Sequence, residues 1–117
     1  MLQLIAFMGS PMSELELLTL FNTMAGNETH GRATVLHSLD TDFGDVGLDS
    51  MDYLVMGLFF FTWWGVDNEI AKKILPLQKD QERTETTFST VREFFDILDK
   101  NKTQNPPTIE QCLAEYI

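Results

Sequence analysis

The sequence is short of basic residues and has a single cysteine, and each shortage excludes a class of protein. Eight lysines and arginines stand against 18 aspartates and glutamates, so the formal net charge is −10. Nucleic acid is therefore an unsuitable partner, whereas a basic protein surface is a favoured one. Cys112 is the only cysteine, so the chain forms no internal disulfide and carries no sign of an oxidising compartment. We expect a cytoplasmic protein in which Cys112 is a buried small hydrophobe.

Patterns typical of membrane spans and metal sites are also missing. The longest apolar run falls short of the roughly 20 residues that cross a bilayer. His30 and His37 stand in one loop without a second pair of ligands, so we expect no metal site there. An EF-hand starting at Asp40 needs glycine at its sixth position and glutamate at its twelfth, where this chain has Asp45 and Met51.

The residues that are present favour a single all-α domain. With 117 residues, 44% of them apolar and nine of them phenylalanine, the chain is long enough to bury one hydrophobic core. Ser13, Thr90 and Thr108 each precede a glutamate or glutamine by three residues, which is the capping box that starts a helix. Apolar residues then recur at intervals of three and four, the spacing of one helix face. These residues are Leu17, Leu20, Phe21 and Met24; Val91, Phe94, Phe95 and Leu98; and Ile109, Cys112, Leu113 and Tyr116.

Two more helices are predicted between the first and second of these capping boxes. One runs from about Ser50 to Trp64 and is unusually apolar. The other is short, at about residues 67–74, and stops at Pro76, because proline disfavours a helical conformation in the residue before it. Residues 78–87 then form a polar linker.

A long loop separates the first two helices. We expect Gly26 to end the first helix, since glycine commonly follows the last helical residue. Residues 27–48 are rich in glycine, aspartate and threonine, and no helical spacing is visible in them. Val35, Leu36 and Phe43 are the apolar residues that we expect to anchor this loop to the core.

A serine stands where this acidic loop becomes the apolar helix, in the run Gly47-Leu48-Asp49-Ser50-Met51-Asp52. Asp49 or Ser50 is expected to cap the helix, because a short side-chain oxygen accepts from first-turn N–H groups that have no helical partner. The helix dipole favours negative charge at this end. That suits Asp49 and Asp52, and it would equally suit a phosphate group on Ser50.

Residues 45–52 resemble the attachment site of acyl carrier proteins and peptidyl carrier domains. In that family an Asp-Ser-Leu or Asp-Ser-Met follows an Asp-hydrophobic-Gly-x step, as Asp45-Val46-Gly47-Leu48 precedes Asp49-Ser50-Met51 here. The family's second helix often ends with an aromatic residue, a glycine and an aliphatic residue, as in Trp64-Gly65-Val66. The order and size of the predicted helices match over about residues 13–98. The resemblance implies a small four-helix acyl-carrier-like bundle with a long first loop.

The chain extends this pattern at both ends. We expect an N-terminal extension at residues 1–12, an acyl-carrier-like domain at 13–100, and a linker with an additional C-terminal helix at 101–117. Because the second helix has more apolar surface than a four-helix core needs, we expect the C-terminal helix to dock its apolar stripe over part of that surface.

The resemblance implies that Ser50 bears a covalent 4′-phosphopantetheine arm, whose thiol holds an acyl group as a thioester. A phosphopantetheinyl transferase would attach the arm, with Asp49 and Asp52 orienting the transferase and Met51 packing beside the arm. A carrier of this kind is not an enzyme. The residues agree, because Ser50 has no histidine in its segment to act as a base and no Gly-x-Ser-x-Gly elbow.

Further partners implied by the resemblance are acyl- or aminoacyl-loading and synthase enzymes with basic surfaces. The charge distribution fits such partners, since ten of the acidic residues lie in residues 1–70 and Arg32 is the only base there. Fatty acid, lipid A, polyketide and peptide assembly remain open as the pathway.

The second helix departs from the family, and this leaves two interpretations. Val55 and Phe61 stand where glutamates are common in carriers. The helix is either buried on all sides or presents an apolar patch to a partner or a second copy. We therefore favour a specialised acyl carrier with a dedicated partner. The alternatives are a peptidyl or aminoacyl carrier, and an unmodified helical interaction module with a carrier-like fold.

Overall fold

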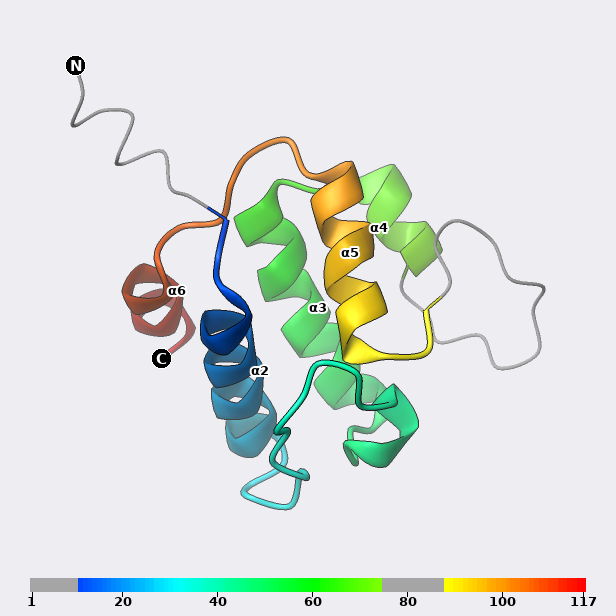
Figure 1. The fold of residues 1–117 in the computed structure, drawn as a ribbon. Helices are drawn as coiled ribbons and strands as arrows, with labels where there is room; N and C mark the ends of the chain where they lie inside the picture. Colours follow the sequence, from blue (N-terminus) through cyan, green and yellow to red (C-terminus); the bar gives the residue numbers. More distant parts are fainter. Residues whose placement is uncertain (1–10, 75–87) are drawn as a thin grey trace.

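The structure, a computed structural model, describes residues 11–74 and 88–117 (Figure 1). No β-strand occurs in these residues, only an isolated bridge between Asp42 and Thr90, so the prediction of an all-α fold is confirmed. The predicted stop at Pro76 and the linker at 78–87 lie outside the described residues, as does most of the extension at 1–12. The elements in chain order are α2 (Glu14–Glu28), the 3-10 turn η1 (Phe43–Asp45), α3 (Ser50–Trp64), α4 (Asn68–Ile74), α5 (Val91–Asn101) and α6 (Ile109–Tyr116).

Reciprocal capping boxes start four of the helices. Those at Ser13, Thr90 and Thr108 confirm the predicted starts of α2, α5 and α6. The fourth was predicted only as a cap, and it pairs Asp49 with Asp52 at the start of α3. A carboxylate at each position makes the same two hydrogen bonds as the usual hydroxyl and glutamate, so the start of α3 is held equally firmly.

The prediction that Gly26 ends the first helix was wrong, because α2 continues to Glu28. Glycine inside a helix costs only about 1 kcal/mol relative to alanine, and the stop signal lies at Thr29. The buried Thr29 hydroxyl donates to the Ala25 carbonyl at 2.7 Å and accepts from the Ala33 N–H at 2.8 Å. His30 then adopts a φ of 56°, which turns the chain out of the helix.

The core is built around α3, which lies between α2 and α5 (Figure 1). Phe60 is fully buried at its centre, and its ring lies 5.2 Å from that of Phe95 and 5.8 Å from that of Phe94, both on α5. The Phe21 ring of α2 stacks on Phe60 from the other side at 6.4 Å. Aromatic contacts of this kind therefore join all three helices through one residue.

Two of the three predicted loop anchors are confirmed. Leu36 and Phe43 are buried, but Val35 is 63% exposed, so its prediction as an anchor was wrong. Leu39 and Val46 are buried as well and complete the set. Val35 was mispredicted because the apolar residues of the loop follow no regular spacing that would show which of them point inward. Its inward residues are selected by hydrogen bonds such as those that hold the Leu36 backbone to the Asn22 side chain at 2.8 and 3.0 Å.

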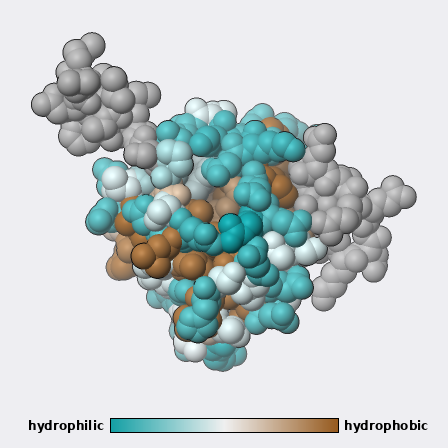
Figure 2. Space-filling model, viewed as in Figure 1, coloured by the Kyte–Doolittle hydropathy of each residue, from teal (hydrophilic) through white to brown (hydrophobic). Residues whose placement is uncertain are grey.

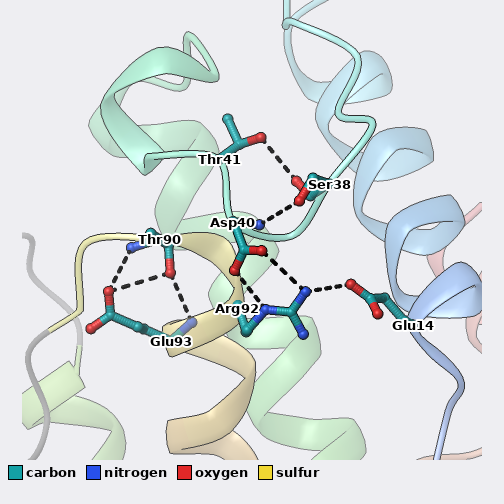
Figure 3. A network of polar contacts seen from close by, with 7 residues as sticks. All are labelled: Glu14, Ser38, Asp40, Thr41, Thr90, Arg92 and Glu93. Carbon is teal, nitrogen blue, oxygen red and sulfur yellow. Dashed lines mark hydrogen bonds and ion pairs between the residues drawn. The ribbon is translucent and has the colours of Figure 1, made fainter.

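A charged cluster fastens the same loop to the helices on either side (Figure 3). Arg92 of α5 donates to Asp40 in the loop at 2.6 Å and also reaches Glu14 at the start of α2. The hydrogen bond from Arg92 holds the pKa of Asp40 below its usual value. The contact is therefore complete at neutral pH and is lost as the pH falls through that lowered pKa.

Helix α6 packs mainly on α2. It reaches α3 where Tyr116 of the stripe meets Phe59, so the expected docking over the second helix is confirmed at that edge, while most of α6 lies on α2 instead. The Tyr116 ring meets the Phe59 ring of α3 edge to face at 5.1 Å, and the Trp63 indole donates to Glu115 at 2.6 Å. Cys112 is fully buried as predicted, and burial raises its pKa to about 12. Figure 2 shows hydrophobic surface over α6 and the adjoining part of α2, and a second hydrophobic area on the opposite side of the same view.

We predict that deleting residues 106–117 lowers the melting temperature and increases dye binding. The deletion uncovers Phe59 and Trp63, and each apolar side chain returned to water costs about 1.5–3 kcal/mol. Thermal unfolding with a hydrophobic dye measures both effects. Removing Ile117 alone, which is 93% exposed, is the matched control and should change neither. Equal melting temperatures for the two truncations would contradict the docking of α6.

Candidate functional site

Ser50 is the first residue of α3, and its side chain is exposed. Gly47, with a φ of 90°, turns the chain toward it, and Asp49 follows as the N-cap, as predicted. The Asp49 carboxylate accepts from the Asp52 N–H at 2.8 Å, and the Asp52 carboxylate accepts from the Asp49 N–H at 3.2 Å. These two bonds bracket Ser50 and Met51, and the Ser50 side chain between them is exposed to solvent.

The start of α3 carries negative charge that the described residues leave unpaired. Asp45 and Asp49 are exposed and Asp52 is half-buried, and no ion pair to a described lysine or arginine involves any of them. Asp40, by contrast, is neutralised by Arg92. Three unpaired carboxylates near one serine produce a field that attracts a basic surface.

The described residues place no general base at Ser50. Its hydroxyl forms no hydrogen bond with a described histidine, and His30 and His37 are both exposed in the loop. No group of three or more histidine, cysteine, aspartate or glutamate side chains in residues 11–74 and 88–117 is arranged to hold a metal ion. What the described residues offer is an accessible hydroxyl at the positive end of a helix.

The interpretation that α3 is buried on all sides was wrong, because part of its surface is buried and part is exposed. Phe61, one of the positions where carriers have glutamate, is only 5% exposed, and Val55 is half-buried. Met51, Leu54 and Leu58 are 64%, 41% and 56% exposed. Their spacing of three and four places them on one line along the helix, which we call the α3 stripe. This apolar stripe begins directly beside Ser50.

Tyr53 is a site residue to which the sequence pattern gave no role. The residue is only 5% exposed, and its hydroxyl has no hydrogen-bond partner among the described residues. Burial raises its pKa well above the usual value, so the hydroxyl keeps its proton. The signal available from the sequence was its position three residues after Ser50, which places it on the same side of the helix.

None of the helices in the described part of the chain is long and apolar enough to cross a membrane. In comparisons with known proteins, no family model, no curated protein and no solved structure matches this chain.

We predict that Tyr53→Phe raises the free energy of unfolding by about 1–3 kcal/mol, because it removes a buried hydroxyl that lacks a partner. Tyr116→Phe is the matched control. The Tyr116 hydroxyl accepts from Asn27 at 2.9 Å and shares its one proton between Glu28 and the Met24 carbonyl, so its loss should lower the free energy by about 0.5–1.5 kcal/mol. Denaturant unfolding compares the two. A loss of stability in Tyr53→Phe would show that its hydroxyl has a partner.

Proposed function

We propose that this protein is a specialised acyl carrier whose Ser50 oxygen bears a 4′-phosphopantetheine arm. The observation that carries the proposal is the exposed Ser50 hydroxyl in the first turn of a firmly capped helix, within the Asp49-Ser50-Met51 sequence that resembles the carrier attachment site.

The chemistry of the site fits such a group. A phosphodiester on Ser50 would lie at the positive end of the α3 dipole, where first-turn N–H groups favour an anion. Because the Ser50 hydroxyl is exposed, a transferase could reach it. The transferase would supply the base and the Mg²⁺ for the reaction. When attached, the arm provides a thiol that holds an acyl group as a thioester. The contribution of the protein is to raise the concentration of that group at each partner.

Partner recognition would combine charge with apolar contact. Asp49 and Asp52 would orient the basic transferase and other basic enzymes, and Met51 would pack beside the arm. Since Phe61 is buried and the α3 stripe is apolar, a synthase that reads several acidic side chains along this helix would find few here. A dedicated partner with an apolar centre and a basic rim fits this surface better.

Two alternatives have support from particular residues. The carried group would be a peptidyl or aminoacyl unit if the loading enzyme activates an amino acid, since the attachment residues are shared by both kinds of carrier. A carrier-like interaction module that is never modified would use the α3 stripe alone. The unmodified module and the carrier differ in one property, which is the loading of Ser50.

We predict that a promiscuous phosphopantetheinyl transferase with coenzyme A adds one phosphopantetheine mass to the wild-type chain and none to Ser50→Ala. The reason is that Ser50 is the exposed first residue of α3 and stands within the Asp49-Ser50-Met51 sequence, whereas Ser13, also exposed at a capped helix start, does not. Ser38→Ala, which removes another exposed serine in the loop, is the control and should load like the wild type. Intact-mass measurement gives the answer. A wild type that stays unmodified under conditions that load a known carrier would leave the interaction module as the better proposal.

We predict further that Asp52→Lys slows loading more than it destabilises the fold. Loss of one favourable charge at a helix start costs only about 0.3–1 kcal/mol, whereas steering to a basic partner changes association rates by about tenfold or more. Loading rate and melting temperature are measured on the same variant. Asp96→Lys makes the same charge change at an exposed position on α5 and should load normally. Normal loading with a sharply lowered melting temperature in Asp52→Lys would mean that Asp52 is structural only.

A further inference from the structure

Helix α6 is attached at its beginning to a fixed point of the fold. The Gln104 side chain donates to the Trp63 carbonyl at 2.9 Å, near the end of α3, and Pro106 is fully buried. The chain is therefore held against α3 before α6 begins. Residues 107–108 form the short connection about which the helix can turn.

The packing of α6 itself is slight. Cys112 is its only buried residue, although Ile109, Leu113 and Tyr116 pack partly against the core. By contrast, α3 has seven buried residues and α5 has five. A short helix with one buried side chain is the kind of element that opens by itself, without unfolding of the whole domain.

The other end of α6 is tied down by polar contacts of one residue. The Tyr116 hydroxyl accepts from Asn27 at 2.9 Å and shares its proton between Glu28 and the Met24 carbonyl. Burial and the hydrogen bond to Glu28 raise the pKa of Tyr116 to about 12, and the nearby charge of Asp52 adds to the rise. Tyr116 therefore fastens α6 beside the acidic start of α3.

Beneath α6 lies an apolar face of α3 that adjoins the α3 stripe. Phe59 meets the Tyr116 ring at 5.1 Å, and Trp63, one turn further along, donates to Glu115 at 2.6 Å. Phe59 directly follows Leu58 of the stripe, so the two surfaces are neighbours around the helix. Departure of α6 would join the Phe59 and Trp63 rings to the stripe in one larger apolar surface.

We propose that α6 is a lid over this surface, which turns outward about residues 107–108 and uncovers Phe59 and Trp63 for a basic, amphipathic helix of a partner protein. The structure shows the closed state, so the partner binds only the fraction of molecules in which the lid is open. Its apparent affinity is reduced by that fraction. The inference stands apart from the carrier function, since it requires no group on Ser50.

The charge beside the covered face favours a basic partner. Glu28 and Asp52 form no ion pair with a described lysine or arginine. When α6 opens, the Glu28 carboxylate loses the donor that Tyr116 supplied, and a lysine or arginine of the partner would take its place. A second copy of this chain suits the face poorly, because each copy has a net charge of −10.

Cys112 reports the opening of the lid in the full-length protein, because it is the only cysteine and is fully buried. N-ethylmaleimide modifies it only when α6 has moved, and intact mass gives the rate. Local opening predicts a rate that changes little at low urea concentrations, whereas modification through global unfolding rises as steeply as unfolding itself. A rate that follows global unfolding at every urea concentration overturns the lid.

Tyr116→Phe loosens the lid but keeps the ring that rests on Phe59. It should speed Cys112 modification about two- to tenfold, because the hydrogen bonds of one hydroxyl are lost. It should also tighten binding of a synthetic amphipathic helix of leucine and lysine by the same factor, since both depend on the open fraction. Fluorescence polarisation of the labelled peptide measures the affinity. Tyr53→Phe, which removes a hydroxyl without a described partner, is the control and should change neither quantity.

Phe59→Ala separates the surface from the lid. It should speed modification too, because Tyr116 loses the ring on which it rests, yet it should bind the peptide less tightly than Tyr116→Phe does. An affinity that stays constant while Cys112 modification accelerates overturns the proposal, because the peptide then binds elsewhere. Equal binding of a peptide with glutamate in place of every lysine also overturns it. Loading of Ser50 can succeed or fail independently of each of these results.

Discussion

Most of the structure follows from the need to cover α3. Bulky apolar side chains surround this helix, and Phe60 fixes the arrangement by contacting Phe21 on one side and Phe95 on the other. Helices α2 and α5 therefore lie on either side of α3, and α6 covers Phe59 and Trp63 beyond them. Dispersion and apolar burial over one central helix hold the elements together more than any single polar contact does. One part of α3 is left incompletely covered, the α3 stripe, which begins beside Ser50.

The same end of α3 is stabilised in a way that suits a modified serine. The Asp49 and Asp52 carboxylates satisfy two backbone donors of the first turn, which fixes the backbone on both sides of Ser50. Because no described lysine or arginine forms an ion pair with them, these carboxylates also leave negative charge at the surface around Ser50. One pair of residues thus shapes the helix start and the field around it. The apolar stripe that continues from Met51 extends the same surface along the helix.

Much of this fold could be predicted from the sequence because it depends on local signals. The capping boxes at Ser13, Thr90 and Thr108 and the apolar spacing after them specify helices that the structure contains. The predictions were wrong where a tertiary contact determines the end of a helix or the burial of a residue. Thr29, rather than Gly26, ends α2 because its hydroxyl finds partners on both sides of the turn, and Val35 is exposed because the Asn22 side chain selects Leu36 instead. Within the site, the motif was enough to predict Ser50 and its acidic neighbours. The burial of the Tyr53 hydroxyl could not be predicted, because it depends on how α2, η1, α3 and α5 pack together.

The proposed carrier function requires that Ser50 be modified in the cell. Trypsin cleaves after Arg32 and Lys72, so residues 33–72 form one peptide that contains both Ser38 and Ser50. Tandem mass spectrometry of this peptide, from protein isolated from its natural source, identifies the modified residue. The account predicts a peptide that carries one phosphopantetheine group, with fragment ions that place it on Ser50. A peptide that is entirely unmodified, or one modified only at Ser38, would contradict it.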